Sequence, residues 1–550
     1  MDILFHFYKA ICSKRAKHHF LLSLLALTSI FILNSCESAK EQKPISGAWI
    51  GTVETRPFPD LVSLTIDSGA IVKLFYNEVE YQPVSDFVHE EGKVSFKIEG
   101  PVFEASFDGE YKNDSIIGLL TINEEHYSCG FVRTIPMALG ETAELTGLYE
   151  VAPGHVVEAS SYIIDFTLNP LLVLDFKTGK KRVAFPQSDL KFVAGQRMLS
   201  PYPSDFDLTF SRGDSGLVKL SSYPGIEKEK HGLRLKNLER KQEVTAQNGD
   251  VMLRGTITYP ESEGDHPLVV YVPGSGMQAR GNILDDFVKL MPYYGIATLV
   301  YDKRGCGEST GSLENYTYED LAKDLEAVVA EASAQPGIDK DRIGLLGIDQ
   351  AGLIMPMVAA NSEQVKFMVN ISGSILSMEE QEYRACALRM RADGFSEKEI
   401  EEAIAYQNLL FDYLKGEADS VALSEASQTV STKIWSGYVT SFENKSYVQW
   451  WRRNYNFSAM PFLEKIDIPQ LTIFGEKDLL IPVEESTQKL TAVYEQKSLK
   501  NSKVNVYSGA NHLMLLGEKR GDFQYTEIEG YPEGLFDDIN EWVAEITGIK

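Results

Sequence analysis

The sequence predicts an α/β protein with a mostly parallel sheet, preceded by one or two small all-β units. Between residues 47 and 134, and again between 145 and 235, short runs of alternating apolar and polar residues are separated by Gly, Asp and Asn. From about residue 241 onward, apolar runs of strand length alternate with amphipathic helical patterns. The first pattern is typical of a sandwich or small barrel, and the second of a parallel sheet with helices on both faces.

Composition narrows the class of protein. The chain has 550 residues, of which 43% are hydrophobic and 24% charged, enough for several globular domains. Its net charge of −26 makes nucleic acid and anionic membrane surfaces poor partners. The sequence has no paired-cysteine zinc spacing, no other metal-ligand constellation and no dinucleotide fingerprint after a strand. We therefore expect no cofactor and no metal, and a small molecule as substrate.

Residues 1–35 read as an export signal. A basic start is followed by an uncharged run over 20–33 that is short for a membrane-spanning helix, and then by Leu33-Asn34-Ser35-Cys36. This ending resembles a bacterial lipoprotein lipobox, which implies cleavage before Cys36 and acylation of that cysteine; the alternative is a plain secretory signal. Both predict export. The lipobox predicts a lipid anchor through Cys36 in the bacterial envelope, on the periplasmic or cell-surface side, with residues 36–45 as a tether.

The two predicted β units cover residues 46–140 and 141–236. Each opens with a glycine two positions before an aromatic residue, Gly47 before Trp49 and Gly147 before Tyr149. This likeness hints at two related units but is too weak to establish a repeat.

The α/β domain is predicted over residues 237–550. It opens with a hairpin signal, Asn248-Gly249-Asp250. Strands are predicted near 268–272, 295–301, 343–348, 365–371, 471–474 and 504–507, and helices near 282–294, 317–334, 350–361, 484–497 and 533–547. Open sheets of this kind place ligands beyond the carboxyl ends of their strands.

A helix-rich and aromatic-rich insertion, here called the lid, interrupts this alternation at about residues 377–459. Its aromatic side chains either shape an apolar pocket or bury against one another, and the second role fits most of them better.

A sharp turn follows the third parallel strand. Gly347 and Ala351 are small and flank Asp349, just as the glycines of a G-x-S-x-G nucleophile elbow flank its serine. The residue presented at the turn is therefore an aspartate. Two more polar residues, Asp478 and His512, follow later strands. Their order along the chain is nucleophile position, acid, histidine, which is the order expected for a hydrolase triad on a parallel sheet.

The chain here resembles the α/β-hydrolase superfamily, in particular the exported bacterial esterase-like or serine-aminopeptidase-like lipoprotein branch. The resemblance covers about residues 241–550. It rests on five blocks that occur in order: Val272-Pro-Gly-Ser-Gly276, Tyr301-Asp-Lys-Arg-Gly-Cys-Gly-Glu-Ser-Thr-Gly311, Gly347–Gly352, Gly475-Glu-Lys-Asp478 and Gly509-Ala-Asn-His512. It implies the α/β-hydrolase fold and hydrolysis of a small organic substrate of ester or acyl type.

The resemblance also implies roles for individual residues. Asp478 would orient His512, and His512 would act as the general base. The backbone N–H of Gln350 and that of Ser275 or Gly276 would form the oxyanion hole. The charged step at 301–305 is most simply a structural turn that holds the loops.

Two departures from the family pattern open alternatives. The oxyanion loop reads Pro273-Gly-Ser-Gly-Met277 in place of His-Gly-Ser-Gly-Pro, and Asp349 replaces the serine. A carboxylate is a poor nucleophile toward esters but can displace a leaving group at saturated carbon, as in epoxide or haloalkane hydrolases on this fold. Such an enzyme needs donors for the leaving group, from Trp435, Trp450, Trp451 or a tyrosine of the lid. The other alternative is a catalytically silent binding lipoprotein on a hydrolase scaffold.

Overall fold

The computed structural model describes residues 43–549 apart from short gaps, and it forms two compact units. The predicted export signal, the predicted lipidation site at Cys36 and most of the predicted tether fall on residues 1–42, outside the described residues. The gaps within the described range are 56–59, 77–78, 81–83, 100–103, 113, 138, 163–168, 214–216, 227–231, 237, 239, 282, 315, 441, 443 and 518–526.

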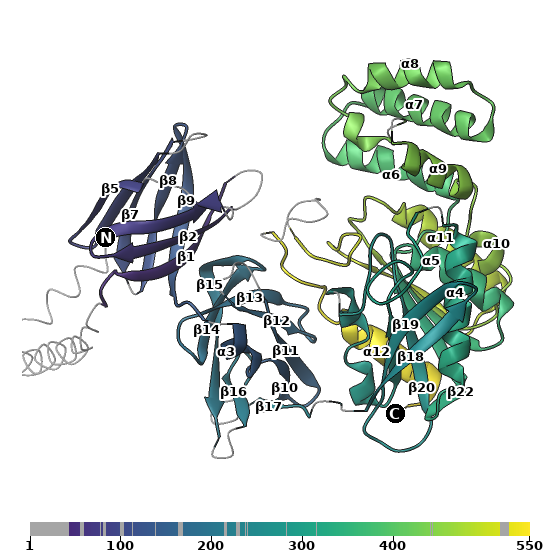
Figure 1. Cartoon of the computed structure of the whole chain (residues 1–550), viewed down its shortest axis with the longest axis horizontal. Helices are drawn as coiled ribbons and strands as arrows, with labels where there is room; N and C mark the ends of the chain where they lie inside the picture. Colours follow the sequence, from purple (N-terminus) through teal and green to yellow (C-terminus); the bar gives the residue numbers. More distant parts are fainter. Residues whose placement is uncertain are drawn as a thin grey trace, which may run out of the picture. The chain divides into compact units, whose positions relative to one another are not determined.

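The first unit is built on one nine-stranded sheet (Figure 1). Buried and exposed residues alternate along its strands, for example along β2, because successive side chains point to opposite faces. Trp49 and Phe107 are fully buried in its core. The strand order is β4-β3-β2-β1-β9-β8-β7-β6-β5, with β1 Gly47–Val53, β2 Asp60–Asp67, β3 Ala70–Tyr76, β4 Val79–Glu80, β5 Val84–Glu90, β6 Lys93–Glu99, β7 Glu104–Lys112, β8 Ser115–Ile122 and β9 Glu125–Thr134.

The second sheet has eight strands and belongs to the second compact unit. It follows the short helix α3 (Leu139–Ala143), and its core contains Tyr149 and Phe192, both fully buried. The order is β16-β15-β14-β13-β12-β11-β10-β17, with β10 Gly147–Ala152, β11 His155–Ser161, β12 Leu171–Asp175, β13 Lys181–Pro186, β14 Lys191–Arg197, β15 Ser200–Arg212, β16 Val218–Ser222 and β17 Leu233–Arg234.

The third sheet also has eight strands and carries the candidate site. Its antiparallel edge is the predicted hairpin, turning at Gly249 with φ 55°, and the strands from β21 to β25 run parallel to one another. The order is β18-β19-β21-β20-β22-β23-β24-β25, with β18 Lys241–Asn248, β19 Val251–Thr258, β20 His266–Val272, β21 Ala297–Tyr301, β22 Ile338–Ile348, β23 Val365–Ile371, β24 Gln470–Gly475 and β25 Lys503–Tyr507.

Helices cover both sides of this sheet. Figure 1 shows α12 (Leu535–Thr547) on one side, with α4 (Tyr318–Ser333) and α5 (Ala351–Asn361) on the other. Helix α11 (Val483–Gln496) packs into the same core as α4 and α5. The fold class predicted from the sequence is thus confirmed: this part of the chain has the α/β-hydrolase fold, and all-β units precede it.

One element differs from its prediction. The single helix expected over 282–294 is two short 3-10 helices, η1 (Ile283–Phe287) and η2 (Met291–Tyr294). Pro292 stands at the start of η2 and has no N–H for a helical hydrogen bond to the preceding turn, which disfavours a continuous helix at this point.

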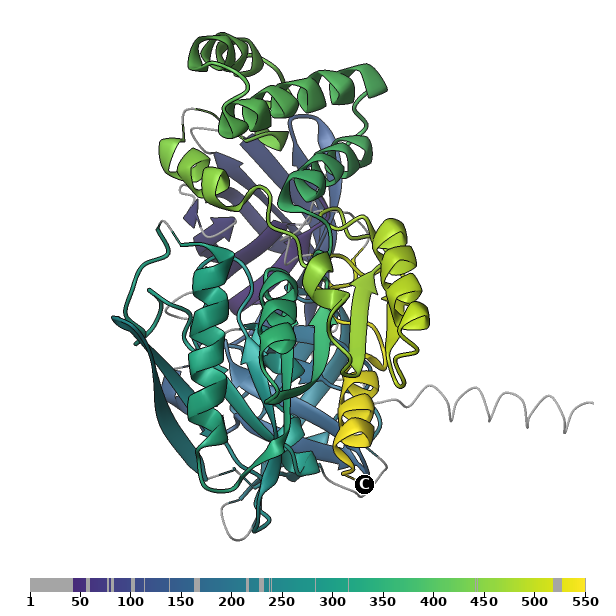
Figure 2. The ribbon, with the colours of Figure 1, turned by 90° about the vertical axis from the view of Figure 1, so that its right-hand side faces the viewer.

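The lid is a layer of helices at one end of the third sheet, drawn in green in Figure 2. Thr317, Ser377 and Ser396 each form a capping box that fixes the start of a helix, namely of α4, α6 and α7. The lid elements are α6 Met378–Ala392, α7 Glu397–Lys415, α8 Ser420–Val430, η3 Ser436–Tyr438 and α9 Lys445–Asn454, and α10 Met460–Leu463 follows. Among the described residues, none of the helices combines the length and hydropathy needed to cross a bilayer.

A buried ion cluster joins the second sheet to the α/β domain. Lys181 of β13 donates to Asp286 Oδ2 at 2.6 Å, and Lys289 lies 3.0 Å from Asp286 Oδ1 and 2.8 Å from Glu158 of β11. Lys181 and Asp286 are both under 5% exposed. Charges buried in this way are stable only when paired, so the two parts depend on each other for their charge balance.

The second sheet also holds the segment that follows His512. Leu516 pairs with Ala510 and with Gly530, and Gly530 in turn pairs with Lys180. Tyr531 N donates to Gly179 O at 2.7 Å, and Met198 N donates to Ile528 O at the same distance. The loop carrying the histidine is therefore connected by backbone hydrogen bonds to the second sheet.

Candidate active site

The turn at Asp349 has the geometry of a nucleophile elbow. Asp349 follows β22 directly and adopts φ 57°, in the left-handed region that non-glycine residues rarely occupy. A Cβ atom on Gly347 would come within 2.4 Å of the Ala351 Cβ, which explains why the first of the two flanking residues must be glycine. Strained strand-to-helix turns of this kind expose one side chain at the sheet edge.

The structure brings Asp349, Asp478 and His512 together at the carboxyl edge of the third sheet. His512 Nδ1 lies 2.8 Å from Asp478 Oδ2, and His512 Nε2 lies 3.4 Å from Asp349 Oδ1. Asp478 is itself fixed, because its Oδ1 accepts from Leu480 N at 2.7 Å and from Ile481 N at 2.9 Å. The imidazole thus stands between two carboxylates, one fully buried and one 30% exposed.

The predicted oxyanion residues lie against the same aspartate. Ser275 N donates to Asp349 Oδ2 at 2.9 Å, and Gly276 lines the same cavity. Gln350 is the N-cap residue of α5, so its backbone N–H belongs to the first turn of that helix, where N–H groups lack partners within the helix. One Asp349 oxygen therefore accepts the hydrogen bond of a predicted oxyanion-hole donor, the Ser275 N–H, and the other oxygen faces His512.

The negative charge of Asp349 and the positive charge of His512 stabilise each other. Burial by itself would raise the pKa of Asp349, but hydrogen bonds and charge from His512 and the Ser275 N–H lower it to about 2. Burial would likewise lower the pKa of His512, but the carboxylates of Asp478 and Asp349 raise it to about 10. At neutral pH these two shifts favour a protonated His512 paired with an ionised Asp349.

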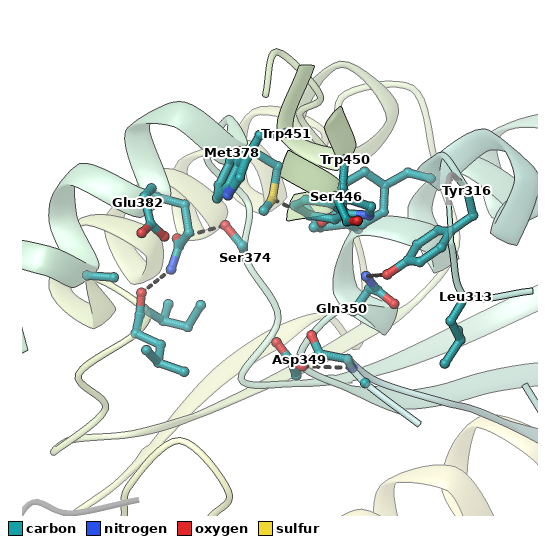
Figure 3. A pocket seen from close by; sticks show the side chains of 18 of the residues that line it. Leu313, Tyr316, Asp349, Gln350, Ser374, Met378, Glu382, Ser446, Trp450 and Trp451 are labelled. Carbon is teal, nitrogen blue, oxygen red and sulfur yellow. Dashed lines mark hydrogen bonds between the residues drawn. The ribbon is translucent and has the colours of Figure 1, made fainter. Parts of the chain in front are cut away.

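A cavity of about 610 Å³ opens above Asp349 and His512. Figure 3 shows Asp349 on one side of it, with Met378, Glu382 and Trp451 of the lid opposite. Polar and charged side chains line it together with apolar and aromatic ones. The lining residues are Ser275, Gly276, Leu313, Glu314, Tyr316, Tyr318, Asp349, Gln350, Leu353, Ser374, Met378, Gln381, Glu382, Ala385, Asn444, Ser446, Gln449, Trp450, Trp451, Leu480, Ile481 and His512.

The lid aromatics divide between the two roles considered from the sequence. Trp450 and Trp451 line the cavity. Trp435 does not: it is 2% exposed and packs with Cys386 and Met390 in a core within the lid. The suggestion that Trp435 supplies a donor to the site is therefore wrong, because its side chain is enclosed by lid helices.

Sequence reasoning missed the part that Lys303 plays beside the site. The charged step at 301–305 does form a structural turn: Asp302 accepts from Arg280 N at 2.7 Å, and Arg304 pairs with Asp324. Lys303, however, donates to Gln350 Oε1 at 2.6 Å, next to Asp349. The available signal was its position directly after β21, at the same sheet edge as the triad.

Glu382 and Tyr316 were also not singled out. Tyr316 OH lies 3.4 Å from Gln350 Nε2. Burial raises the pKa of the Glu382 carboxyl, which receives a 3.3 Å hydrogen bond from Gln407. Within the described residues, no three His, Cys, Asp or Glu side chains are grouped so that they could hold a metal ion.

Fold, elbow and triad geometry together define an α/β-hydrolase domain. Residues 267–519 match the family model described as alpha/beta hydrolase fold, and this match supports assignment of that part of the chain to the α/β-hydrolase superfamily.

Similar proteins cover different shares of this chain. An uncharacterized 31.7 kDa protein from the traX-finO intergenic region of Escherichia coli is 32% identical over 115 residues, which are 21% of this chain and 40% of that protein. Polyketide transferase grgF of Penicillium sp is 24% identical over 276 residues, 49% of this chain and 88% of that protein. The solved structure of Est1E from Butyrivibrio proteoclasticus with ferulic acid bound has a TM-score of 0.36 and 17% identity, covering 56% of this chain and 99% of that one.

Proposed function

We propose that this protein is a hydrolase in which Asp349 forms a covalent ester with a saturated carbon of a small organic substrate, and in which His512 promotes hydrolysis of that ester. The match to the alpha/beta hydrolase fold supports a hydrolase-type function. One observation carries the choice of chemistry: Asp349 Oδ2 accepts from Ser275 N at 2.9 Å, while Oδ1 lies 3.4 Å from His512 Nε2 in the wall of the cavity.

The first step is a displacement. Asp349 is ionised, so Oδ1 can attack a carbon that bears a leaving group without first losing a proton. A carbon–oxygen bond forms to Oδ1, and the bond to the leaving group breaks with its electron pair. The leaving group is a halide, or an epoxide oxygen that takes up a proton from solvent. Trp450, Trp451 and Tyr316 line the cavity and carry N–H or O–H groups suited to this departing atom.

The second step is hydrolysis of the ester. Esterification removes the negative charge of Asp349, one of the two carboxylates that raise the pKa of His512, so this pKa falls and the neutral imidazole becomes accessible by release of its proton to solvent. His512 then takes a proton from water, and the hydroxide attacks the Asp349 Cγ. The charge that develops on Oδ2 meets the Ser275 N–H already bonded to it. The ester bond breaks and the departing oxygen takes the proton that His512 had received from water, so the product leaves as an alcohol. The Asp349 carboxyl group then gives its proton to His512, which restores the starting pair of carboxylate and imidazolium.

Hydrolysis of an ester or acyl substrate is the second candidate. The resemblance implies it, and the relative that this chain covers to 88% is a polyketide transferase. It is less well supported because a carboxylate is a poor nucleophile toward an ester, and because Asp349 itself occupies the Ser275 donor that an acyl oxyanion would need. The silent binding lipoprotein is supported least, since Asp349 is paired with His512 rather than with Lys or Arg and the cavity is open.

The test traps the covalent intermediate. Wild type, His512→Gln and His512→Gln/Asp349→Asn are incubated with panels of epoxides, haloalkanes and p-nitrophenyl esters, and intact mass is recorded. An adduct equal to the alkyl group is expected in His512→Gln alone, because alkylation does not need the base whereas hydrolysis does. Peptide mapping should place it on Asp349. If His512→Gln carries no adduct on any epoxide or haloalkane while wild type hydrolyses p-nitrophenyl esters, the acyl reaction replaces this proposal.

We also propose that the protein is exported and anchored by a lipid on Cys36. The lipobox-like Leu33-Asn34-Ser35-Cys36 supports this, and so does the short apolar run before it. Radiolabelled palmitate incorporation into wild type but not into Cys36→Ser tests the anchor. Export without incorporation would favour the plain secretory signal.

A further inference from the structure

Lys303 is a buried lysine beneath the elbow. It is 3% exposed, and its ammonium donates to three oxygens: Gly274 O at 2.7 Å, Gly276 O at 3.3 Å and Gln350 Oε1 at 2.6 Å. Its three N–H groups thus all donate hydrogen bonds to two segments beside Asp349, the oxyanion loop and the start of α5. None of the ion pairs among the described residues includes it.

The bond to Gly274 has a specific consequence. The carbonyl of Gly274 and the N–H of Ser275 are the two ends of one peptide group, and this N–H is the one that donates to Asp349 Oδ2. A cation on the carbonyl oxygen draws electron density from the peptide, so its N–H becomes a stronger donor. The ammonium therefore acts on the carboxylate through a peptide dipole without touching it.

We propose that Lys303 is a positioning residue, which fixes the oxyanion loop against the elbow and strengthens the Ser275 N–H as the donor for charge developing on Asp349. The proposal rests on the proposed function, since that charge arises in the hydrolysis of the Asp349 ester. The loop sequence Pro273–Met277 lacks the usual leading histidine, and here a lysine two residues after the neighbouring strand β21 holds the loop by hydrogen bonds.

A merely structural lysine would affect folding only, so the test needs a readout at the donor itself. Protein labelled with 13C′-glycine and 15N-serine gives amide signals only from the three Gly-Ser steps, at Ser275, Ser312 and Ser374. Ser275→Ala and Ser312→Ala assign them. Lys303→Met and Lys303→Gln should move the Ser275 amide proton upfield, because the donor weakens. Arg304→Met is the matched control: it removes the neighbouring cation, which pairs with Asp324 and does not contact the loop.

Wild type provides the same test without a substitution. Burial lowers the pKa of Lys303 to about 8, against the opposing effect of the Asp349 charge. The other groups around the ammonium are Cys306 in its own turn and the ring of Tyr316, 5.7 Å away. The Ser275 signal should therefore move upfield with a midpoint near pH 8 in wild type and in Arg304→Met, and should lose this step in Lys303→Met.

The kinetic consequence is specific to one step. With a substrate that alkylates Asp349, Lys303→Met should slow hydrolysis of the ester by about 10- to 100-fold, less than the loss of a direct oxyanion donor. The alkylation rate should change little, so adduct accumulates even with His512 intact. The inference is overturned if the Ser275 amide signal changes neither in Lys303→Met nor with pH. It is also overturned if Lys303→Met slows alkylation of Asp349 and hydrolysis of the ester equally. If no substrate ever forms an adduct but the Ser275 signal responds, the proposed function fails while the role of Lys303 in strengthening the donor stands.

Discussion

His512 Nε2 lies 3.4 Å from Asp349 Oδ1, on the opposite side of the imidazole ring from the 2.8 Å contact between Nδ1 and Asp478. A serine at position 349 would form a hydrogen bond with the imidazole ring, whereas the aspartate forms an ion pair with it. Asp478 and Asp349 both favour the charged imidazole, and in the proposed reaction esterification of Asp349 removes one of these two carboxylates.

The first prediction concerns stability against pH. The lowered pKa of Asp349 contributes stability above its unfolded value of about 3.9, and this is lost as the pH falls toward 2. The raised pKa of His512 contributes stability that is fully present below about pH 6.5 and is lost as the pH rises through about 10. By calorimetry, the Tm advantage of wild type over His512→Gln should be largest between about pH 4 and 6.5, and should shrink by pH 10. A constant difference across this range would contradict the ion pair.

The second prediction concerns replacement of the proposed nucleophile, Asp349, by serine. Asp349→Ser should place a hydroxyl beside His512 and release the Ser275 N–H for a substrate oxyanion. We expect p-nitrophenyl acetate hydrolysis about 10³-fold above that of Asp349→Ser/His512→Gln, with an acyl-enzyme visible by mass. If the two variants have equal rates, the elbow and the histidine are not aligned for acyl transfer.

The third prediction separates the two carboxylates. Asp478→Asn should lower turnover about 10³- to 10⁴-fold, because the amide cannot hold the imidazole in the correct tautomer. Alkylation of Asp349 should continue, so the adduct accumulates in single-turnover mass measurements. Glu476→Gln is the control: this carboxylate is exposed, two residues away, and should leave turnover within about twofold of wild type.

The fourth prediction concerns the buried ion cluster. Lys181→Ala removes a fully buried partner of Asp286, and we expect a loss of about 3 kcal/mol, at the lower end for broken buried pairs because Lys289 still contacts Asp286. Lys180→Ala, next in the chain, removes a pair with Asp205 whose lysine is 44% exposed, and should cost less than about 1 kcal/mol. Urea unfolding midpoints measure both, and equal losses would show that the cluster adds nothing beyond an ordinary surface pair.

Sequence patterns predicted the sheet and the meeting of three distant side chains for a simple reason. The carboxyl ends of parallel strands lie at one edge, so residues that follow β22, β24 and β25 must come close together, whatever separates them in the chain. The cavity lining was not predictable in this way, because the lid helices pack against one another and only some of their faces reach the site. Trp435 and Trp451 look alike in sequence, yet only Trp451 lines the cavity.

The contacts of Lys303 show a second limit of prediction from the sequence. Its contacts depend on β21 lying next to β20 in space, although helical segments separate the two in sequence. Only this neighbour relation brings its ammonium under the loop that follows β20. A charged residue after a strand gives no hint of which loop it will brace until the strand order is known.

The backbone ladder from Gly179 and Lys180 to Gly530 and Tyr531 limits how this chain can be divided. The α/β domain is therefore not independent of the second sheet. A shortened protein that begins at the hairpin near residue 241 would keep Asp349, Asp478 and His512 but would lose the backbone partners of the segment that follows His512. Protein engineers who want the smallest working version should retain the second sheet, and fusions are better joined ahead of residue 147 than between the two parts.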